Sequence, residues 1–319
     1  MPASLARRDF LAGMVAMTAA GATSGFATPS ITVRPFRVSV INDEVSQDFG
    51  HVCEVASREF GMGWIELRSM WKKNIVALDE KEVAEARRLL EKYQLKVTDI
   101  ASPLFKVDWP GAPKSKFSEG KSFGANFSLS QQDEVLERAI EMAKAFGTDR
   151  VRCFDFWRLE DQTPYRAAIN DKLREAATKA EKKGIILVLE NEPACNTATG
   201  AEAAKVLSAV QSPSFMLNWD PGNAAASGEV AYPDGYNLLP KERIGHCHCK
   251  DVGKLGKDDW APMGGGLIDW AGQFKALKHD GYSFAVSLET HWSGGGSPEE
   301  CSRKSWAGMK KLLLEADAW

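Results

Sequence analysis

Short apolar runs typical of buried strands recur along the chain, and helical patterns separate most of them. The runs cover residues 36–41, 64–68, 95–100, 149–154, 185–190, 215–220, 243–248 and 284–289. Helical patterns cover residues 47–60, 79–93, 131–146, 170–183, 201–210, 268–279 and 298–316. Strand–helix units that repeat about eight times predict an α/β fold, a closed (β/α)8 TIM barrel. An open doubly wound sheet is the alternative, but the Gly-rich fingerprint that usually follows its first strand is missing.

Two regions depart from this repeat. The helical pattern is weak between the sixth and seventh runs, because proline and glycine interrupt it. Residues 102–130 form a long segment rich in Gly, Ser, Phe and Lys. Loops of this length inside a compact domain usually serve a function, so we expect a lid or a binding loop.

Composition and charge narrow the class of protein. The 319-residue chain is 44% hydrophobic and 26% charged, which is typical of a globular protein with a full core. One barrel domain over residues 28–319 suits this length. The net charge of -3 offers no general basic surface, so we expect no nucleic-acid partner. Whether the barrel forms a homo-oligomer stays open.

The first 27 residues have the features of a twin-arginine signal peptide, with Arg7 and Arg8 ahead of a mildly apolar stretch from Leu11 to Ala22. We expect cleavage after Ala27, the twin-arginine export machinery as a partner, and a periplasmic or otherwise exported protein. The stretch is too short, and too rich in Ala, Gly and Thr, for a permanent membrane anchor. A disordered start with chance arginines is the alternative.

The six cysteines show no disulfide-framework spacing. Cys247 and Cys249 alternate with His246 and His248 along one predicted strand, so they face the opposite side of the sheet. We expect both cysteines to be buried against helices as small hydrophobic residues. His246 lies one layer deeper than His248, and we interpret it as a core histidine.

Four metal-type side chains stand at the ends of the last four strands: Glu190, Asp220, His248 and Glu289. Parallel strands bring their carboxyl ends together, so these side chains are expected to converge on one divalent cation. We expect Mn2+ in preference to Mg2+, Co2+ or Zn2+. The alternative is that each residue merely caps a helix, but caps favour Ser, Thr, Asn and Asp rather than Glu and His.

Such a cation would bind a carbonyl and the hydroxyl beside it, and would stabilise the enediolate formed when the carbon loses its proton. Glu190 and Glu289 end strands on nearly opposite sides of the ring, so we expect them to be the catalytic bases. Epimerisation, isomerisation and loss of a leaving group all share this intermediate, and the four ligands alone do not separate them.

The loops around the strand ends supply candidate substrate-binding residues, which are Arg68, Lys106, Glu192, Lys250 and His291. Lys250 is favoured because it shares the inward parity of His248, with a surface ion pair to Asp251 as its alternative. The others could equally be solvated loop residues. Four tryptophans in predicted loops either stack on sugar rings or pack locally; they are Trp109, Trp157, Trp260 and Trp292.

The motifs at these strand ends are Leu189-Glu190-Asn191-Glu192-Pro193, Asn218-Trp219-Asp220-Pro221-Gly222-Asn223, His246-Cys247-His248-Cys249-Lys250-Asp251 and Leu288-Glu289. Together they resemble the xylose isomerase-like TIM barrels of the sugar phosphate isomerase/epimerase superfamily. That superfamily includes ketose 3-epimerases, hydroxypyruvate isomerases and inosose dehydratases. The resemblance covers roughly residues 36 to 316, and it implies one divalent metal on the same Glu, Asp, His and Glu.

Two departures from the family pattern matter. Ketose epimerases usually carry a His three positions after the Asp ligand, where this chain has Asn223, which we include among the substrate-binding candidates. Endonuclease IV, a distant relative, assembles three zincs from many histidines, and five histidines in the whole chain are too few for that.

The sequence therefore predicts a metal-dependent isomerase or epimerase that acts on a non-phosphorylated sugar or sugar derivative. A lyase or dehydratase of a keto-sugar or 3-keto-glycoside on the same metal site is the first alternative. A non-catalytic carbohydrate-binding barrel is the alternative from another class.

Overall fold

The predicted strands are present, and they pair side by side as one parallel sheet. The computed structural model describes residues 34–118 and 127–319. Within that part the sheet has eight strands in the order β1-β12-β9-β8-β7-β6-β5-β2. They are β1 (Arg37–Val40), β2 (Trp64–Leu67), β5 (Lys96–Leu104), β6 (Arg150–Cys153), β7 (Ile186–Glu190), β8 (Phe215–Trp219), β9 (Ile244–Cys249) and β12 (Ala285–Leu288). A parallel bridge between Ile41 and Glu66 joins the two ends, so the sheet closes into the predicted (β/α)8 barrel.

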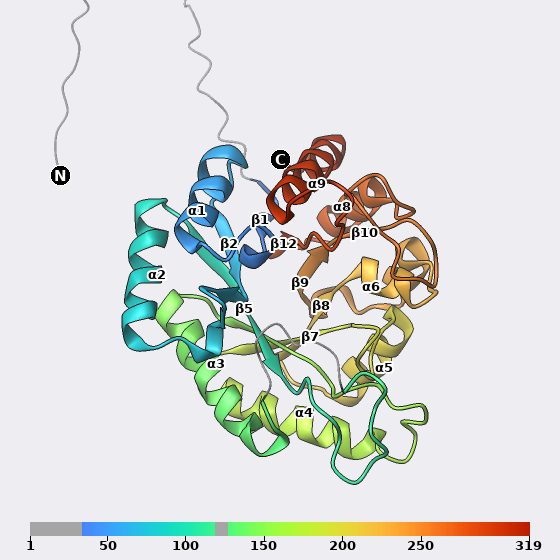
Figure 1. Cartoon of the computed structure of the whole chain (residues 1–319). Coiled ribbons are helices and arrows are strands. Elements are labelled where there is room, and N and C mark those ends of the chain that lie inside the picture. The colour runs from blue at the N-terminus through green and yellow to red at the C-terminus, as the bar shows by residue number, and fades with distance from the viewer. Residues whose placement is uncertain (1–33, 119–126) are drawn as a thin grey trace, which may run out of the picture. The chain divides into compact units, whose positions relative to one another are not determined.

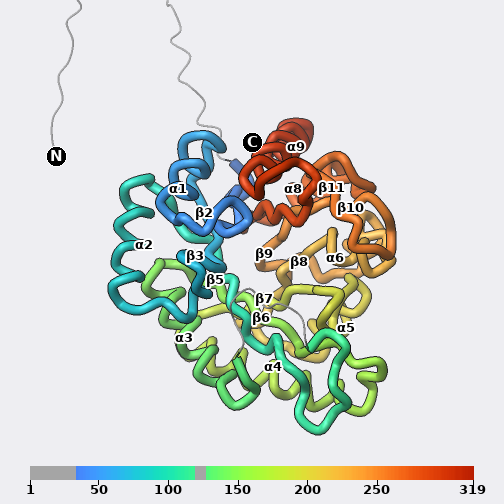
Figure 2. Tube along the Cα trace, in the orientation of Figure 1, coloured from blue at the N-terminus to red at the C-terminus, as the bar shows by residue number. Residues whose placement is uncertain are grey.

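Helices surround the strands, and the colours in Figures 1 and 2 run once around the ring from blue to red. The helices are α1 (Phe49–Glu54), α2 (Glu80–Lys92), α3 (Gln132–Phe146), α4 (Arg166–Glu181), α5 (Gly200–Ala209), α6 (Pro221–Ala226), α7 (Tyr236–Leu238), α8 (Trp270–His279) and α9 (Pro298–Glu315). The last helix, α9, lies beside α1, and His51 contacts Glu299 at 2.9 Å there. In the described part of the chain, none of the helices has the length and apolar character needed to cross a membrane.

Local signals in the sequence set several helix ends. α2 begins with a capping box in which Asp79 and Glu82 each accept the backbone N–H of the other. Ser297 and Glu300 form the same arrangement at the start of α9. α3 ends at Gly147, whose φ of 70° is the left-handed conformation that glycine adopts without strain.

The structure differs from the predicted elements in two places. β5 continues to Leu104, so the long connection starts later than predicted, and residues 119–126 of it lie outside the described part. The predicted helix over 47–60 is a shorter α1 followed by a wider π-type turn over Val55–Glu59. The predicted signal peptide, residues 1–27, also lies outside the described residues.

Two short antiparallel pairs extend the loops at the carboxyl ends of the strands. β3 (Ser69–Met70) pairs with β4 (Lys73–Asn74), and β10 (Asp251–Val252) pairs with β11 (Trp260–Ala261). Both pairs follow strands whose last residues face the barrel mouth, so they hold loop side chains close to that mouth.

The apolar core lies between the strands and the surrounding helices. Leu187, Leu189, Cys247 and Cys249 are fully buried in this layer. Both cysteines are free thiols, as are the other four. The prediction that Cys247 and Cys249 pack as small hydrophobic residues on the helix side is therefore confirmed.

The inside of the barrel is polar. His246 on β9 reaches Glu66 on β2 across the interior, with 2.9 Å between His246 Nε2 and Glu66 Oε2. Ser39, Asp99 and Asn218 are also fully buried polar residues of the barrel strands. Most TIM barrels fill this space with branched apolar side chains. Burial of polar groups here is unfavourable, so we expect these side chains to serve a function that offsets this loss of stability.

The burial of Asp99 in this interior is expected to lower the stability of the folded protein. Both of its carboxylate oxygens are buried without a hydrogen-bond partner among the described residues. Burial raises the pKa of the Asp99 carboxyl to about 6. The folded protein therefore holds on to this proton at pH values where the unfolded chain has already released it.

The variant Asp99→Asn is expected to raise the free energy of unfolding above about pH 6 by about 2–3 kcal/mol. Between about pH 4 and pH 6 the native state binds more protons at Asp99 than the unfolded state, so this residue lowers stability as pH rises through that window. Urea unfolding at about pH 4.5 and about pH 7.5 checks this. A variant that loses stability at the higher pH would show that a partner compensates the charge.

A second prediction concerns the contact between α9 and the loop that carries Met263. A methyl group at Gly308 would lie 1.9 Å from the carbonyl oxygen of Met263, whereas one at Gly50 in α1 would make only ordinary contacts at 3.5 Å or more. We expect Gly308→Ala to lower the free energy of unfolding by about 1–2 kcal/mol, because overpacking outweighs the gain in helix propensity.

The matched control is Gly50→Ala, which should raise the free energy of unfolding by about 0.5–1 kcal/mol through helix propensity alone. Thermal unfolding of both variants beside the parent chain measures the contrast. Equal stabilisation by the two substitutions would contradict the close approach at Met263.

Candidate metal centre and active site

The four predicted metal ligands meet at the carboxyl ends of neighbouring strands. Glu190 is the last residue of β7, Asp220 follows β8, His248 lies in β9 and Glu289 follows β12. One ligand atom from each lies within 4.8 Å of the others. This convergence follows from the parallel barrel, which points the ends of consecutive strands at one opening.

His248 stands at the centre of the group. Its Nδ1 lies 3.3 Å from Glu190 Oε1, 3.4 Å from Glu289 Oε2 and 3.6 Å from Asp220 Oδ2. All four side chains are buried. Three carboxylate oxygens and one imidazole nitrogen facing a common point form a donor set that suits a divalent cation such as Mn2+, Mg2+ or Zn2+.

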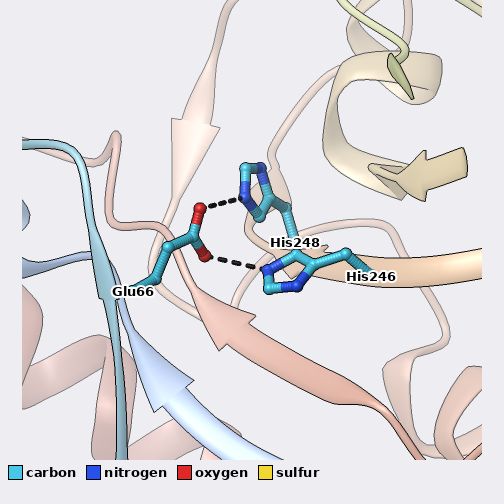
Figure 3. Close-up of side chains that lie close together, drawn as sticks. All are labelled: Glu66, His246 and His248. Carbon is cyan, nitrogen blue, oxygen red and sulfur yellow. Dashed lines mark hydrogen bonds and ion pairs between the residues drawn. The ribbon is translucent and has the colours of Figure 1, made fainter. Parts of the chain in front are cut away.

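Glu66 fixes the orientation of the His248 ring (Figure 3). One carboxylate oxygen of Glu66 lies 3.0 Å from His248 Nε2, and the other lies 2.9 Å from His246 Nε2. Although burial favours its protonated form, the two imidazoles hold the pKa of Glu66 well below its usual value. An ionised Glu66 accepts a hydrogen bond from His248 Nε2, so Nδ1 is the ring nitrogen that faces the other three ligands and could bind a cation.

His246 is thus a buried residue with a partner, as its depth in the predicted strand indicated. It is fully buried, and its ring lies edge-on to His248 with 5.3 Å between the ring centres. Glu66 bridges the two imidazoles, so His246 supports the ligand His248 through a shared carboxylate.

Three buried cations neutralise the ligand carboxylates. Arg152 on β6 lies 3.0 Å from Glu190 Oε2, and Arg68 donates to Glu289 Oε1 at 2.9 Å. Burial opposes ionisation of Glu190, but Arg152 and His248 hold its pKa at about 2. Lys250 in turn holds the pKa of Glu289 well below its usual value, against the effect of burial. Both carboxylates are therefore ionised at neutral pH and available as ligands or bases.

Lys250 is buried at the centre of the site. Its Nζ lies 2.8 Å from Asp220 Oδ2 and also contacts Glu289 Oε2. The alternative of a surface ion pair with Asp251 is wrong, because Asp251 instead accepts the backbone N–H groups of the loop from Gly264 to Ile268. The inward parity of Lys250 along the strand predicted its place correctly.

The remaining predicted residues surround the metal ligands. Asn223 donates to Glu190 Oε1 at 3.3 Å, and His291 Nε2 lies 3.3 Å from Glu289 Oε1. Lys106 donates to Glu192 Oε2 at 2.6 Å. The Lys106 ammonium also lies over the rings of Phe154 and Trp157, 4.5 and 5.5 Å from their centres, so aromatic faces position this ion pair.

All six predicted substrate-binding residues line one cavity of about 270 Å3 above the metal ligands. Its wall consists of Arg68, Lys106, Phe117, Arg152, Glu190, Glu192, Pro193, Ala194, Asn223, Lys250, Asp258, Trp260, Glu289 and His291. Sequence reasoning missed Arg152 and the role of Glu66. The available signal for Arg152 was its alternation with apolar residues in a buried strand, which points a charge inward.

Two of the four loop tryptophans lie where they could stack on a ligand, and the other two pack locally. Trp260 lines this cavity, and Trp292 lines a neighbouring one. Trp109 packs edge-on against Phe156 at 4.7 Å, and Trp157 is buried beside Phe154. Only the first two therefore have the position that stacking on a ligand requires.

Comparison with known proteins finds a curated relative and several solved structures that resemble this chain. L-ribulose-5-phosphate 3-epimerase UlaE from Escherichia coli is 26% identical over 167 residues, which are 50% of this chain and 56% of the epimerase. The chain thus matches about half the length of this curated relative. A xylose isomerase domain protein from Alicyclobacillus acidocaldarius has a similar structure, with a TM-score of 0.67 at 17% identity over 88% of this chain and 99% of that one.

The IOLI protein, which was solved with a bound zinc atom, has a TM-score of 0.66 at 17% identity over 89% of this chain and 99% of its own. These structural similarities show the fold. The sequence model of the family described as xylose isomerase-like TIM barrel matches residues 55–312, which is most of the barrel. The chain therefore belongs to the xylose isomerase-like TIM barrel family.

Proposed function

We propose that the protein is a divalent-metal-dependent isomerase or epimerase of a non-phosphorylated sugar or sugar derivative. The observation that carries the proposal is the buried group of Glu190, Asp220, His248 and Glu289. This group lies at a cavity whose wall includes arginine and lysine side chains. When bound, a cation supplies Lewis-acid chemistry that stabilises the negative charge of an enediolate. We prefer Mn2+ for this site, with Mg2+, Co2+ and Zn2+ as alternatives.

The two glutamates are the proposed bases. Glu190 and Glu289 belong to β7 and β12, which two other strands separate in the sheet. They can therefore approach a substrate from different sides. Removal of a proton by one carboxylate and return by the other inverts the carbon, which is epimerisation. Return of the proton to the neighbouring carbon is isomerisation.

The other cavity residues hold the substrate. Arg68, Lys250 and His291 can donate to the carbonyl and hydroxyl oxygens near the reacting carbon, because all three line the cavity beside Glu289. The predicted twin-arginine signal at residues 1–27 would direct the enzyme to export, and phosphorylated sugars stay in the cytoplasm. This motivates the choice of a non-phosphorylated substrate.

A lyase or dehydratase of a keto-sugar or keto-glycoside is the second candidate. The Lys106 ammonium favours it, because this group lies in the same cavity beside Glu192 and can protonate a leaving oxygen. A lyase would release water or an aglycone, whereas an isomerase would keep the carbon skeleton intact.

The variants Glu190→Gln and Glu289→Gln test the two-base mechanism. In deuterated water with Mn2+, we expect the parent chain to label one of the ketose pairs that differ only at C3, D-fructose with D-allulose or D-tagatose with D-sorbose. Each variant should lose deuterium uptake from a different member of that pair by about 100-fold or more, because each base serves one face. NMR identifies the labelled carbon and any released group.

Asp220→Asn is the matched control, since it removes a proposed metal ligand but neither base. It should reduce labelling of both sugars to the same extent. Full labelling by Glu289→Gln with unchanged metal content would refute the mechanism. An absence of metal-dependent labelling and of any product would leave the carbohydrate-binding barrel as the better explanation.

Glu66→Gln is expected to weaken Mn2+ binding by about 10- to 100-fold, because the amide no longer fixes the His248 tautomer. Manganese titration followed by electron paramagnetic resonance measures the free ion directly. Glu54→Gln, whose carboxylate pairs with Arg58 on the surface, is the control and should bind Mn2+ like the parent chain. Equal affinities in all three proteins would mean that Glu66 only fills the interior.

A further inference from the structure

We propose that a second cavity beside the metal site binds a second sugar ring, so that the substrate is a disaccharide or other glycoside. The inference rests on the proposed function and names its substrate class. The second cavity measures about 550 Å3 and shares Arg68, Trp260 and His291 with the metal cavity. The metal cavity alone lies just below the range of about 300–1,000 Å3 for ligand sites, and the two together reach well into it.

Trp260 lines both cavities. The antiparallel pairing of Val252 with Trp260 in β10 and β11 holds its backbone. Lys250 Nζ lies 5.3 Å from the centre of its ring, and the His291 ring meets it edge-on at 5.0 Å. One indole therefore borders both the metal centre and the neighbouring space, and a ligand with two rings could contact it from each side.

Trp292 supplies a second aromatic wall. It is half-buried, and a glycine pair packs close to its ring. A methyl group at Gly294 or Gly295 would come within 2.7 Å of the indole, so only glycine allows this approach. The position of Trp292 is thereby restricted, and a fixed flat apolar surface suits the apolar face of a sugar ring.

Thr290 supplies a polar group that has no protein partner. The residue is only 8% exposed, and its Oγ1 makes no hydrogen bond within the described residues. Thr290 lines the second cavity together with Trp292. A buried hydroxyl without a partner is unfavourable, and a hydroxyl of a ligand would satisfy it.

The charges of the second cavity favour a neutral ring over a phosphate or carboxylate group. Asp43 and Glu44 line it, and both repel anions. Arg68 also lines it, but its guanidinium already contacts Asp43, Glu44 and Glu289 at 2.6 to 2.9 Å. The cavity thus offers aromatic surface, a hydroxyl and carboxylate acceptors, which is the combination that recognises a sugar ring.

Calorimetric titration with D-fructose and four glucosyl-fructoses tests this proposal. The disaccharides turanose, maltulose, leucrose and palatinose attach glucose to different hydroxyls of the same ketose. With the Mn2+-loaded full chain, we expect at least one of them to bind about tenfold more tightly than fructose. Trp292→Ala should reduce that ratio to about one, and Thr290→Val should reduce it by about three- to tenfold while preserving the shape of the side chain.

Trp64→Ala is the matched control, because Trp64 is a half-buried tryptophan at the start of β2, under Arg37 at the opposite end of the barrel. It should keep the full ratio. The proposal is overturned if no disaccharide binds more tightly than fructose, or if the gain persists in both Trp292→Ala and Thr290→Val. Deuterium uptake from fructose tests the proposed function separately. Uptake can be absent although the second ring binds, and uptake can occur although no second ring binds.

Discussion

The mutual repulsion of three buried carboxylates is the constraint on which the site depends. Glu190, Asp220 and Glu289 hold their oxygens within a few ångströms of one imidazole, and none of them is exposed enough for water to screen the others. Three buried cationic side chains reduce this repulsion. Arg152 and Lys250 pair directly with these ligands, and Arg68, which directly follows β2, does the same.

The polar interior of the barrel extends this compensation below the metal ligands. Glu66 spans the interior and contacts both His246 and His248, so the orientation of a ligand is set from the far wall of the barrel. A barrel filled with leucine and valine would hold its strands together equally well, but it could not orient an imidazole. Asp99 shows the cost of this choice, since its carboxylate is buried without a partner.

Much of the site could be predicted from the sequence, because ligands at the ends of parallel strands depend only on strand order and parity. Glu190 and His248 could be recognised in this way, and the inward place of Lys250 followed from counting along one strand. The link from Glu66 to His248 could not, because it joins strands on opposite sides of the ring and depends on how the barrel closes. The pairing of Arg152 with Glu190 could not be predicted for a related reason. Parity along a strand indicates that a side chain points inward, but it does not identify the partner that the side chain contacts.

The closure of the ring has a consequence for the order in which the protein can form. β1 pairs with β12, so the backbone hydrogen bonds along one edge of β1 can form only after β12 has been synthesised. Arg34, the first described residue, stacks on the ring of Trp319, which follows α9, 3.5 Å from its centre. During synthesis β1 therefore keeps an open edge that can pair with other chains, and a nascent barrel needs protection until its final helix has emerged. A barrel that closes by pairing β1 with β12 is complete only after β12 has been synthesised.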